Sequence, residues 1–201
     1  GLGDVYKRQV LIRGESGTGK DLVAKEIHKN SKYSDGNFII VNSALMEPDG
    51  IEEELFGLEE NSRIIKQGFF EQANNGTLFI DEIGDMPIQT QSKILRVLTD
   101  SSFYRVGSNE PVNVNARLLC SSTENLEKLV ENGNFRMDLF HRLNVVPIEL
   151  SSLSKRSEDI PLLIEYFKKN YRVITPDLPG FGKSNKAKSY KSIKSISSWS
   201  K

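Results

Sequence analysis

The sequence predicts an α/β fold in which a mainly parallel five-stranded sheet carries helices on both faces. Short apolar runs typical of buried strands alternate with segments of helical periodicity, the pattern of a parallel sheet. The first run leads through a glycine-rich turn directly into a helical segment. Apolar residues make up 37% of the 201 residues and charged residues 27%, a balance that supports a core of ordinary size.

Five apolar runs are predicted as strands, at residues 10–13, 38–41, 77–80, 117–121 and 145–149. One helix is expected over residues 21–30, because Leu22, Val23 and Ile27 recur on one face. A second is expected over residues 87–98, with Pro87 in its first turn. Residues 103–106 and 112–114 flank a turn and are expected to form a hairpin before the fourth strand.

Charge and cysteine content exclude several classes of protein. Lysine plus arginine equals aspartate plus glutamate, at 27 each, which argues against a general electrostatic nucleic-acid binder. The single cysteine, Cys120, excludes an internal disulfide. No run of about 18 apolar residues indicates a membrane span. We therefore expect a cytoplasmic protein with no membrane partner.

A phosphate-binding loop is predicted between the first strand and the first helix. Residues 14–20 fit the pattern G-x-x-x-x-G-K, and its members are Gly14, Glu15, Ser16, Gly17, Thr18, Gly19 and Lys20. The glycines allow the backbone N–H groups to point at a phosphate, and the helix N-terminus adds partial positive charge. Asp21 follows, where the common motif has a Ser or Thr that ligates Mg²⁺. The segment predicts ATP binding.

An acidic pair, Asp81 and Glu82, directly follows the predicted strand at residues 77–80. In this position Asp81 can hold Mg²⁺, directly or through water. Glu82 can orient and deprotonate an attacking water. Together with the phosphate loop, the pair predicts an ATPase that uses ATP and Mg²⁺.

Five motifs occur in order: GESGTGK at 14–20, ELFG at 54–57, GFFEQA at 68–73, GTLFIDEIGDMP at 76–87 and FRMDLFHRLN at 135–144. Together they resemble the central domain of the sigma-54-dependent transcriptional activators, a branch of the AAA+ ATPases. The resemblance runs from residue 10 to about residue 167. It implies an AAA+ P-loop NTPase core with strand order 5-1-4-3-2, in a regulator of transcription of the two-component type.

The resemblance also assigns roles to residues at the predicted site. Lys20 corresponds to the lysine that contacts phosphate, and Asp21 stands where the family usually has Glu. Asp81 corresponds to the Mg²⁺ ligand and Glu82 to the residue that activates water. Asn42 matches the asparagine that holds the catalytic glutamate in reserve.

Arg136 and Arg142 resemble the arginine fingers, which reach the γ-phosphate bound by a neighbouring subunit. A guanidinium can neutralise charge on the transferring phosphoryl group, so we expect the chain to act as a ring or at least a dimer. Thr123 stands where the family usually has an asparagine that senses the γ-phosphate. Its hydroxyl can still donate one hydrogen bond.

One segment departs from the family pattern. Sigma-54 activators carry a loop reading roughly G-A-F-T-G-A between the second and third motifs, whereas residues 58–67 here are shorter and lack it. This puts the contact with sigma-54 in doubt. The shortened loop is similar to that of the NtrX-type response regulators of the group.

The two ends of the chain are expected to differ from its core, at residues 10–152. Residues 1–9 are interpreted as a non-native leader, and residues 153–170 as the start of the family's helical lid, most of which is absent. Residues 171–201 are rich in lysine and serine and include a stretch that resembles α/β-hydrolases, which indicates a chimeric reading frame. Contact with DNA is expected only through a domain that the sequence does not contain.

Parts of the sequence bear on three other functions. The sequence argues against an α/β-hydrolase because no G-x-S-x-G motif occurs. The two histidines also do not suit a catalytic role, since His28 lies on a predicted helix and His141 lies in the segment that resembles the arginine fingers. A nucleotide-binding regulatory or oligomerisation module without significant turnover stays open as the alternative. DNA binding by the lysine-rich tail is the third option, and we expect its deletion to have no effect.

Overall fold

A five-stranded parallel sheet forms the centre of the computed structural model, which describes residues 9–159, 161–162 and 165. Its strands lie in the order β2-β5-β8-β1-β9. Their bounds are β1 Val10–Gly14, β2 Phe38–Asn42, β5 Thr77–Asp81, β8 Arg117–Ser122 and β9 Val146–Leu150. These are the five predicted strands, and read from β9 their order is the expected 5-1-4-3-2.

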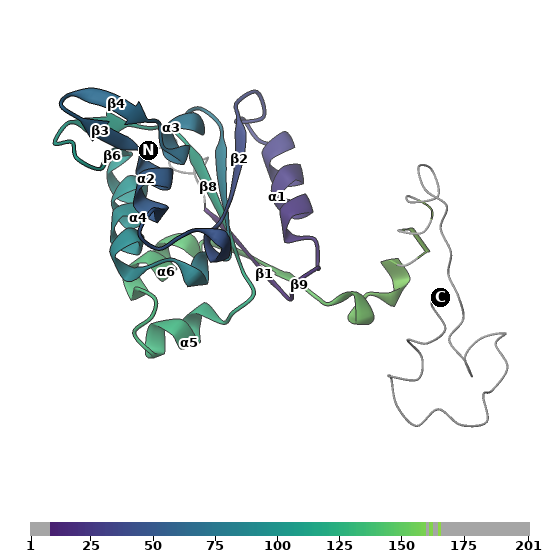
Figure 1. Cartoon of the computed structure of the whole chain (residues 1–201). Helices are drawn as coiled ribbons and strands as arrows, with labels where there is room; N and C mark the ends of the chain where they lie inside the picture. Colours follow the sequence, from purple (N-terminus) through teal and green to yellow (C-terminus); the bar gives the residue numbers. More distant parts are fainter. Residues whose placement is uncertain (1–8, 160, 163–164, 166–201) are drawn as a thin grey trace, which may run out of the picture. The chain divides into compact units, whose positions relative to one another are not determined.

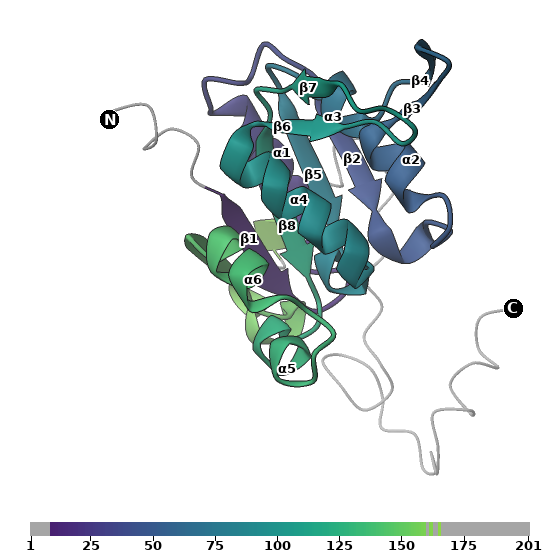
Figure 2. The ribbon, with the colours of Figure 1, turned by 90° about the vertical axis from the view of Figure 1, so that its left-hand side faces the viewer.

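Helices cover both faces of this sheet, as the strand pattern predicted. Helix α1 (Lys20–Lys29) lies on one face (Figure 1). The helices of the opposite face are α2 (Ile51–Phe56), α3 (Phe69–Gln72), α4 (Ile88–Asp100) and α6 (Met137–Leu143), with α5 (Leu126–Glu131) beside α6 (Figures 1 and 2). The first helix thus begins one residue earlier than predicted, and α4 begins directly after Pro87.

Alternation along the strands divides the core into two layers. Val10 and Ile12 of β1 pack with Ala24 beneath α1, whereas Leu11 between them belongs to the larger core under α2, α4 and α6. Successive side chains of a strand point to opposite faces, so a run buried on both sides reads as continuously apolar. This explains why β1, β5 and β8 could be recognised in the sequence.

A buried glutamine of α4 positions the start of α6. The Gln91 side chain is fully buried and donates to the carbonyl oxygens of Met86 (2.7 Å) and Asn134 (3.1 Å). Its own carbonyl oxygen accepts from the backbone N–H of Arg136 at 2.8 Å. Because a buried amide is stable only when its polar atoms are paired, these three bonds define where the chain enters α6.

Two antiparallel hairpins lie beyond one end of the sheet (Figure 1). Strands β6 (Ser102–Tyr104) and β7 (Pro111–Asn113) form the predicted hairpin. Strands β3 (Leu58–Glu60) and β4 (Arg63–Lys66) form a second hairpin where only a shortened loop was expected. Its turn places Asn61 and Ser62 at positive φ (48° and 59°), the backbone of a tight two-residue hairpin turn.

The chain divides into two compact units at Lys155 and Arg156, and the site lies in the first. Single 3₁₀ turns occupy Leu153–Lys155 and Ser157–Asp159, and residues 161, 162 and 165 are helical. The rest of the expected lid start, residues 1–8 of the leader and the whole tail at 171–201 lie outside the described residues. Within the described part, no helix has the length and apolar character needed to cross a membrane.

Candidate functional site

The phosphate loop connects β1 to α1 with the curvature that its glycines allow. Gly17 and Gly19 have positive φ (78° and 87°), a conformation that other residues rarely adopt. A Cβ at Gly14 would lie 2.8 Å from the carbonyl oxygen of Leu150, so this position also requires glycine. Gly19 precedes the first turn of α1 without a side-chain cap, which leaves the N–H groups of that turn available to an anion.

Lys20 turns its ammonium group back into the loop and across to the neighbouring strands. Its side chain is 7% exposed, and Nζ donates to the carbonyl oxygen of Gly14 at 3.1 Å. It also donates to the hydroxyl of Thr123, at the end of β8, at 3.1 Å. Nζ lies 3.2 Å from Oε1 of Glu82. The lysine of the loop thus meets residues that follow two other strands.

The carboxyl ends of three parallel strands bring the predicted acidic pair to this loop. Asp81 ends β5, and Glu82 follows it with a left-handed backbone (φ 55°, ψ 54°), a costly conformation for a residue other than glycine. The Glu82 carboxylate accepts from the backbone N–H of Thr123 at 2.8 Å and from its hydroxyl. Strain of this kind occurs most often at functional sites.

The electrostatic environment keeps Glu82 ionised. Burial alone raises the pKa of the Glu82 carboxyl, but hydrogen bonds from the Thr123 hydroxyl and N–H, together with the charge of Lys20, outweigh burial and hold it below its usual value. A carboxylate in this state can accept a proton from a water molecule.

The Asp81 carboxylate is held by two neighbouring strands. Asn42 pairs with it in the β2–β5 register, and its Nδ2 donates to Oδ2 of Asp81 at 3.1 Å. The hydroxyl of Ser121, on β8, donates to the other carboxylate oxygen. Asn42 therefore contacts Asp81 here, and among the hydrogen bonds of the described residues none joins it to Glu82, which it was expected to hold.

Ser121 is a site residue that the sequence pattern did not single out. Besides contacting Asp81, its oxygen accepts from the backbone N–H of Glu82 at 3.2 Å. Ile80 pairs with Cys120, so Asp81 and Ser121 follow at the same level of adjacent strands. Ser121 could have been identified from the strand order that the family resemblance implies, together with the register of β5 and β8.

The two predicted arginine fingers lie at opposite ends of α6, away from this carboxylate cluster. Arg136 caps the helix and forms a bidentate pair with Asp138 (3.0 and 2.7 Å). Arg142, in the last turn, donates to the carbonyl oxygen of Leu98 at 3.0 Å. The structure therefore does not bring either guanidinium to the chain's own phosphate loop.

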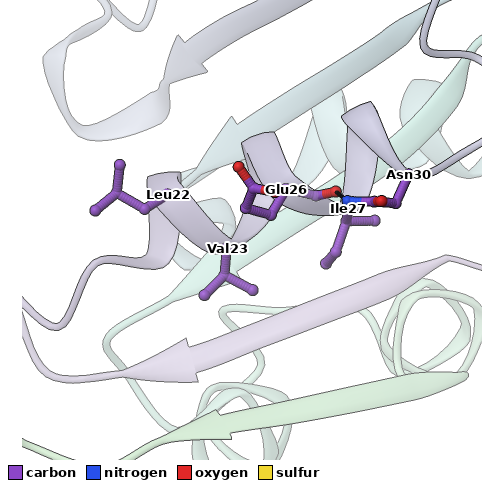
Figure 3. Close-up of a pocket in the computed structure, with 5 residues that line it drawn as sticks. All are labelled: Leu22, Val23, Glu26, Ile27 and Asn30. Atoms are coloured by element: carbon purple, nitrogen blue, oxygen red, sulfur yellow. Dashed lines mark hydrogen bonds between the residues drawn. The ribbon is translucent and has the colours of Figure 1, made fainter. Parts of the chain in front are cut away.

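Shallow hollows on α6 and on α1 lie outside the cluster. One, of about 420 Å³, is lined by Arg136, Met137, Asp138 and His141, and its Met137 is 62% exposed. The other, of about 440 Å³, lies along α1, where Figure 3 shows Val23 and Ile27 pointing to the same side. Its lining (Leu22, Val23, Glu26, Ile27 and Asn30) includes no cation, so it does not suit a phosphate.

The residues at the phosphate loop fit a nucleotide with Mg²⁺. The loop offers backbone N–H groups and a lysine for phosphate oxygens, while Asp81 and Asp21 offer the carboxylate oxygens that Mg²⁺ prefers. No group of three or more His, Cys, Asp or Glu side chains suited to a metal occurs within the described residues. Mg²⁺ is usually bound by one or two carboxylates together with phosphates, and Asp81 offers a carboxylate beside the loop.

Comparison with known proteins shows a consistent set of relatives. A family model described as the sigma-54 interaction domain matches residues 4–149. The chain is 52% identical over 162 residues to the DNA-binding transcriptional regulator NtrC of Salmonella typhimurium, covering 79% of this chain and 34% of NtrC. It is 47% identical over 160 residues to the nitrogen assimilation regulatory protein NtrX of Azorhizobium caulinodans, covering 79% and 35%.

Solved structures agree with the sequence matches. The crystal structure of NtrX from Brucella abortus in complex with ATP superposes with a TM-score of 0.79 at 45% identity, covering 85% of this chain and 39% of that one. At 17% identity, the P-loop NTPase domain of a sigma-54 activator from E. coli superposes with a TM-score of 0.51, which supports the fold alone. The chain spans about a third of the length of the curated relatives it matches.

Proposed function

The chain belongs to the sigma-54 interaction domain family and has the AAA+ P-loop NTPase fold, and from this premise we propose that it binds and hydrolyses ATP. The observation that supports this most directly is the meeting of Lys20, Asp81, Glu82 and Thr123 at the carboxyl ends of three parallel strands. Ligands of open α/β sheets bind at this edge.

Each residue of the cluster has a role in this proposal. Backbone N–H groups of residues 14–19 and the ammonium of Lys20 bind the phosphates. Asp81 holds Mg²⁺, with Asp21 close to the same helix terminus, and the bound ion neutralises charge that develops on the phosphates. Glu82 orients the attacking water and accepts its proton. Thr123 contacts the γ-phosphate through its hydroxyl.

Asn42 acts in this proposal by fixing the orientation of Asp81. Its Nδ2 donates to Asp81, and its Oδ1 accepts from the backbone N–H of Ala44 at 3.0 Å. An amide held at both ends can keep a carboxylate in one rotamer. This differs from the expectation that Asn42 holds Glu82.

We further propose that hydrolysis takes place between subunits, with Arg136 and Arg142 supplied by a neighbour. Helix α6 buries Leu139, Phe140 and Leu143, whereas Met137, next to Arg136, exposes most of its side chain to solvent. An exposed methionine beside arginine is typical of an interface core. The active form is then a ring or at least a dimer.

The parent protein is proposed to be a cytoplasmic transcriptional regulator that binds DNA through another domain. This rests on the printed names of the NtrC and NtrX relatives. The short β3–β4 hairpin in place of the G-A-F-T-G-A loop favours the NtrX type and leaves a sigma-54 contact unsupported. The sequence identities to NtrC (52%) and NtrX (47%) are too similar to assign the chain to one of these two types.

Thermal unfolding with and without Mg-ATP tests the site. A ligand that binds only the folded state stabilises it by about 2.7 kcal/mol when present at a hundred times its Kd. We expect this stabilisation in the parent chain and in Lys29→Ala, an exposed lysine on the same helix, and its loss in Lys20→Ala. An equal shift in all three proteins would refute the proposed phosphate site.

Turnover separates hydrolysis from the alternative of a regulatory module that only binds nucleotide. Glu82→Gln keeps the shape of the side chain and removes the base. We expect phosphate release by the parent chain and loss of about three orders of magnitude in the variant. Equal rates in the two proteins would support the module without turnover.

A further inference from the structure

Arg13 is a largely buried cation at the point where β1 enters the phosphate loop. Its side chain is 17% exposed, and the next residue, Gly14, is the first of the loop. Because side chains alternate along a strand, Arg13 lies on the same face of the sheet as Leu11, which belongs to the core under α6. A charge in such a place is unfavourable unless other groups pair with it. The contacts of Arg13 therefore indicate what this charge is used for.

The guanidinium of Arg13 joins two helices through separate nitrogens. Nη1 lies 2.8 Å from Oε1 of Glu127 in α5, and Nη2 donates to Oδ1 of Asn144, the C-cap residue of α6, at 3.3 Å. The guanidinium carbon lies 5.7 Å from the centroid of the Phe140 ring, also in α6. Glu149 of β9 lies 3.7 Å from Nη1. One side chain of β1 thus contacts α5, α6 and β9.

Helix α6 is held at both ends by side chains of other elements. At its start, the buried Gln91 accepts from the backbone N–H of Arg136 at 2.8 Å. At its end, Arg13 contacts Asn144. Within the described residues, this contact is the side-chain hydrogen bond that joins α6 to the central sheet. Arg136 and Arg142, the residues proposed to serve a neighbour, lie between the two attachments.

The ion pair between Arg13 and Glu127 is better suited to fixing a position than to stabilising the fold. Nε of Arg13 and Oε2 of Glu127 are buried without a hydrogen-bond partner among the described residues. A partly buried pair with unsatisfied atoms returns little free energy, because both charges leave water. Its planar fork, however, holds the carboxylate and the Asn144 amide in two defined directions, which a single ammonium group does not.

We propose that Arg13 is a positioning residue, which fixes α6 against the strand that leads into the phosphate loop and so sets where a chain presents Arg136 and Arg142 to its neighbour. This rests on the proposed hydrolysis between subunits. A guanidinium must approach the γ-phosphate closely to act on it, and a misplacement of about 1 Å can lower a rate by about a hundredfold. A contact distant from the reacting atoms can therefore control turnover.

Three variants separate positioning from stability. Arg13→Met removes the fork and leaves the Glu127 carboxylate without its cation. Arg13→Met combined with Glu127→Leu removes both charges, a replacement that is often neutral or stabilising. Arg13→Lys keeps the charge but has one donor group. Arg63→Met, which replaces an exposed arginine of β4, is the control. Each protein is compared with the parent in urea unfolding, in thermal stabilisation by Mg-ATP and in phosphate release.

We expect Mg-ATP to stabilise all the variants as it does the parent, because the residues of the loop are unchanged. Phosphate release should fall by at least about tenfold in the three Arg13 variants and stay at the parental rate in the control. If release recovers in the variant without either charge together with its resistance to urea, Arg13 acts on stability alone and the proposal is overturned. Loss of the stabilisation by Mg-ATP would place the defect in the chain's own loop and would also overturn it.

Mixing shows which half of the site is affected. Arg13→Met mixed equally with Lys20→Ala, which keeps both arginines, should recover about a quarter of parental release, since a quarter of random head-to-tail interfaces join an intact loop to well-placed arginines. Mixed with the variant that combines Arg136→Ala and Arg142→Ala, it should release no more phosphate than the two proteins apart. The opposite pattern, or recovery in neither mixture, overturns the proposal.

Failure of the proposed function is recognised in proteins that keep Arg13. If Mg-ATP does not stabilise the parent chain, the phosphate site is refuted and the role of Arg13 with it. If Lys20→Ala and the double-arginine variant fail to complement each other while the parent is active, the arginines do not act between chains and the role of Arg13 toward a neighbour is refuted. When both tests succeed, the Arg13 mixtures decide the role of Arg13 alone.

Discussion

His28 is a buried histidine at the end of α1 opposite Lys20. Its Nδ1 lies 2.9 Å from the hydroxyl of Thr77, and its ring centroid lies 5.0 Å from that of Phe38. Burial, and secondarily the positive charge of Arg117, lowers the pKa of His28 below its ordinary value of 6.5. The imidazole is therefore neutral in the folded protein at neutral pH.

This lowered pKa predicts a loss of stability in mild acid. Because the unfolded chain binds the proton at higher pH than the folded one, the contribution of neutral His28 is complete above pH 6.5 and is lost as the pH falls through the lower folded pKa. We expect His28→Asn to flatten the free energy of unfolding between about pH 7 and pH 5.5, by up to about 1.4 kcal/mol per pH unit.

Urea unfolding across this pH range measures the effect. The chain's other histidine supplies the control, because His141 is exposed and His141→Asn leaves the contacts of His28 with Thr77 and Phe38 in place. An identical slope in His28→Asn and the parent would mean that His28 does not titrate on unfolding in this range.

Among the elements, the two hairpins beyond the sheet are joined by one arginine. Arg105 follows β6 and forms a bidentate pair with Glu71 of α3 (2.9 and 2.7 Å) and a further bond to Glu59 of β3 (3.0 Å). The three side chains are each 12% exposed. Backbone bonds between Glu59 and Val106 (2.9 Å) and between Val106 and Gly57 (2.9 Å) run beside them.

Removing this arginine should loosen the β3–β4 hairpin. Arg105→Met leaves the nearly buried carboxylates of Glu59 and Glu71 without a cation. We expect the free energy of unfolding to fall by about 3 kcal/mol, because removing one partner of a buried ion pair leaves the other charge uncompensated. Faster amide hydrogen exchange confined to residues 57–66 and 102–107 would locate the effect. Arg63→Met, an exposed arginine of β4, is the matched control. If hydrogen exchange instead became faster to the same extent throughout the central sheet, Arg105 would not act only on the two hairpins.

The sequence predicts the centre of the sheet well because β1, β5 and β8 are buried on both faces and form nearly continuous apolar runs. The β3–β4 hairpin was not predicted, because its strands are largely exposed and carry no apolar alternation. Its contacts are made with Arg105 and Val106, which follow β6. The site shows the same limit. Asp81 and Glu82 could be predicted from the apolar run that precedes them. The contact between Asn42 and Asp81 depends on the register of β2 and β5, which the sequence around either residue does not reveal.

At the scale of the whole molecule, catalysis is predicted to need more than one chain. The loop and carboxylate cluster lie at the carboxyl ends of β1, β5 and β8, whereas Arg136 and Arg142 are paired with Asp138 and the Leu98 carbonyl of their own chain. If these arginines serve a neighbour, a chain that cannot bind ATP can still complete another chain's site.

Mixing two inactive variants tests this arrangement. Lys20→Ala should lose its own site but keep both arginines, and Arg136→Ala with Arg142→Ala should keep its site but lose the arginines. Random head-to-tail assembly of equal amounts places an intact site against intact arginines at about a quarter of the interfaces, so about a quarter of parental phosphate release should return. Turnover per chain in the parent should also rise with protein concentration. If the double-arginine variant is fully active alone, neither guanidinium takes part in hydrolysis. If the mixture of the two variants stays inactive while the parent chain is active, the arginines act in the chain's own site. Helix α6 would then have to move toward that site.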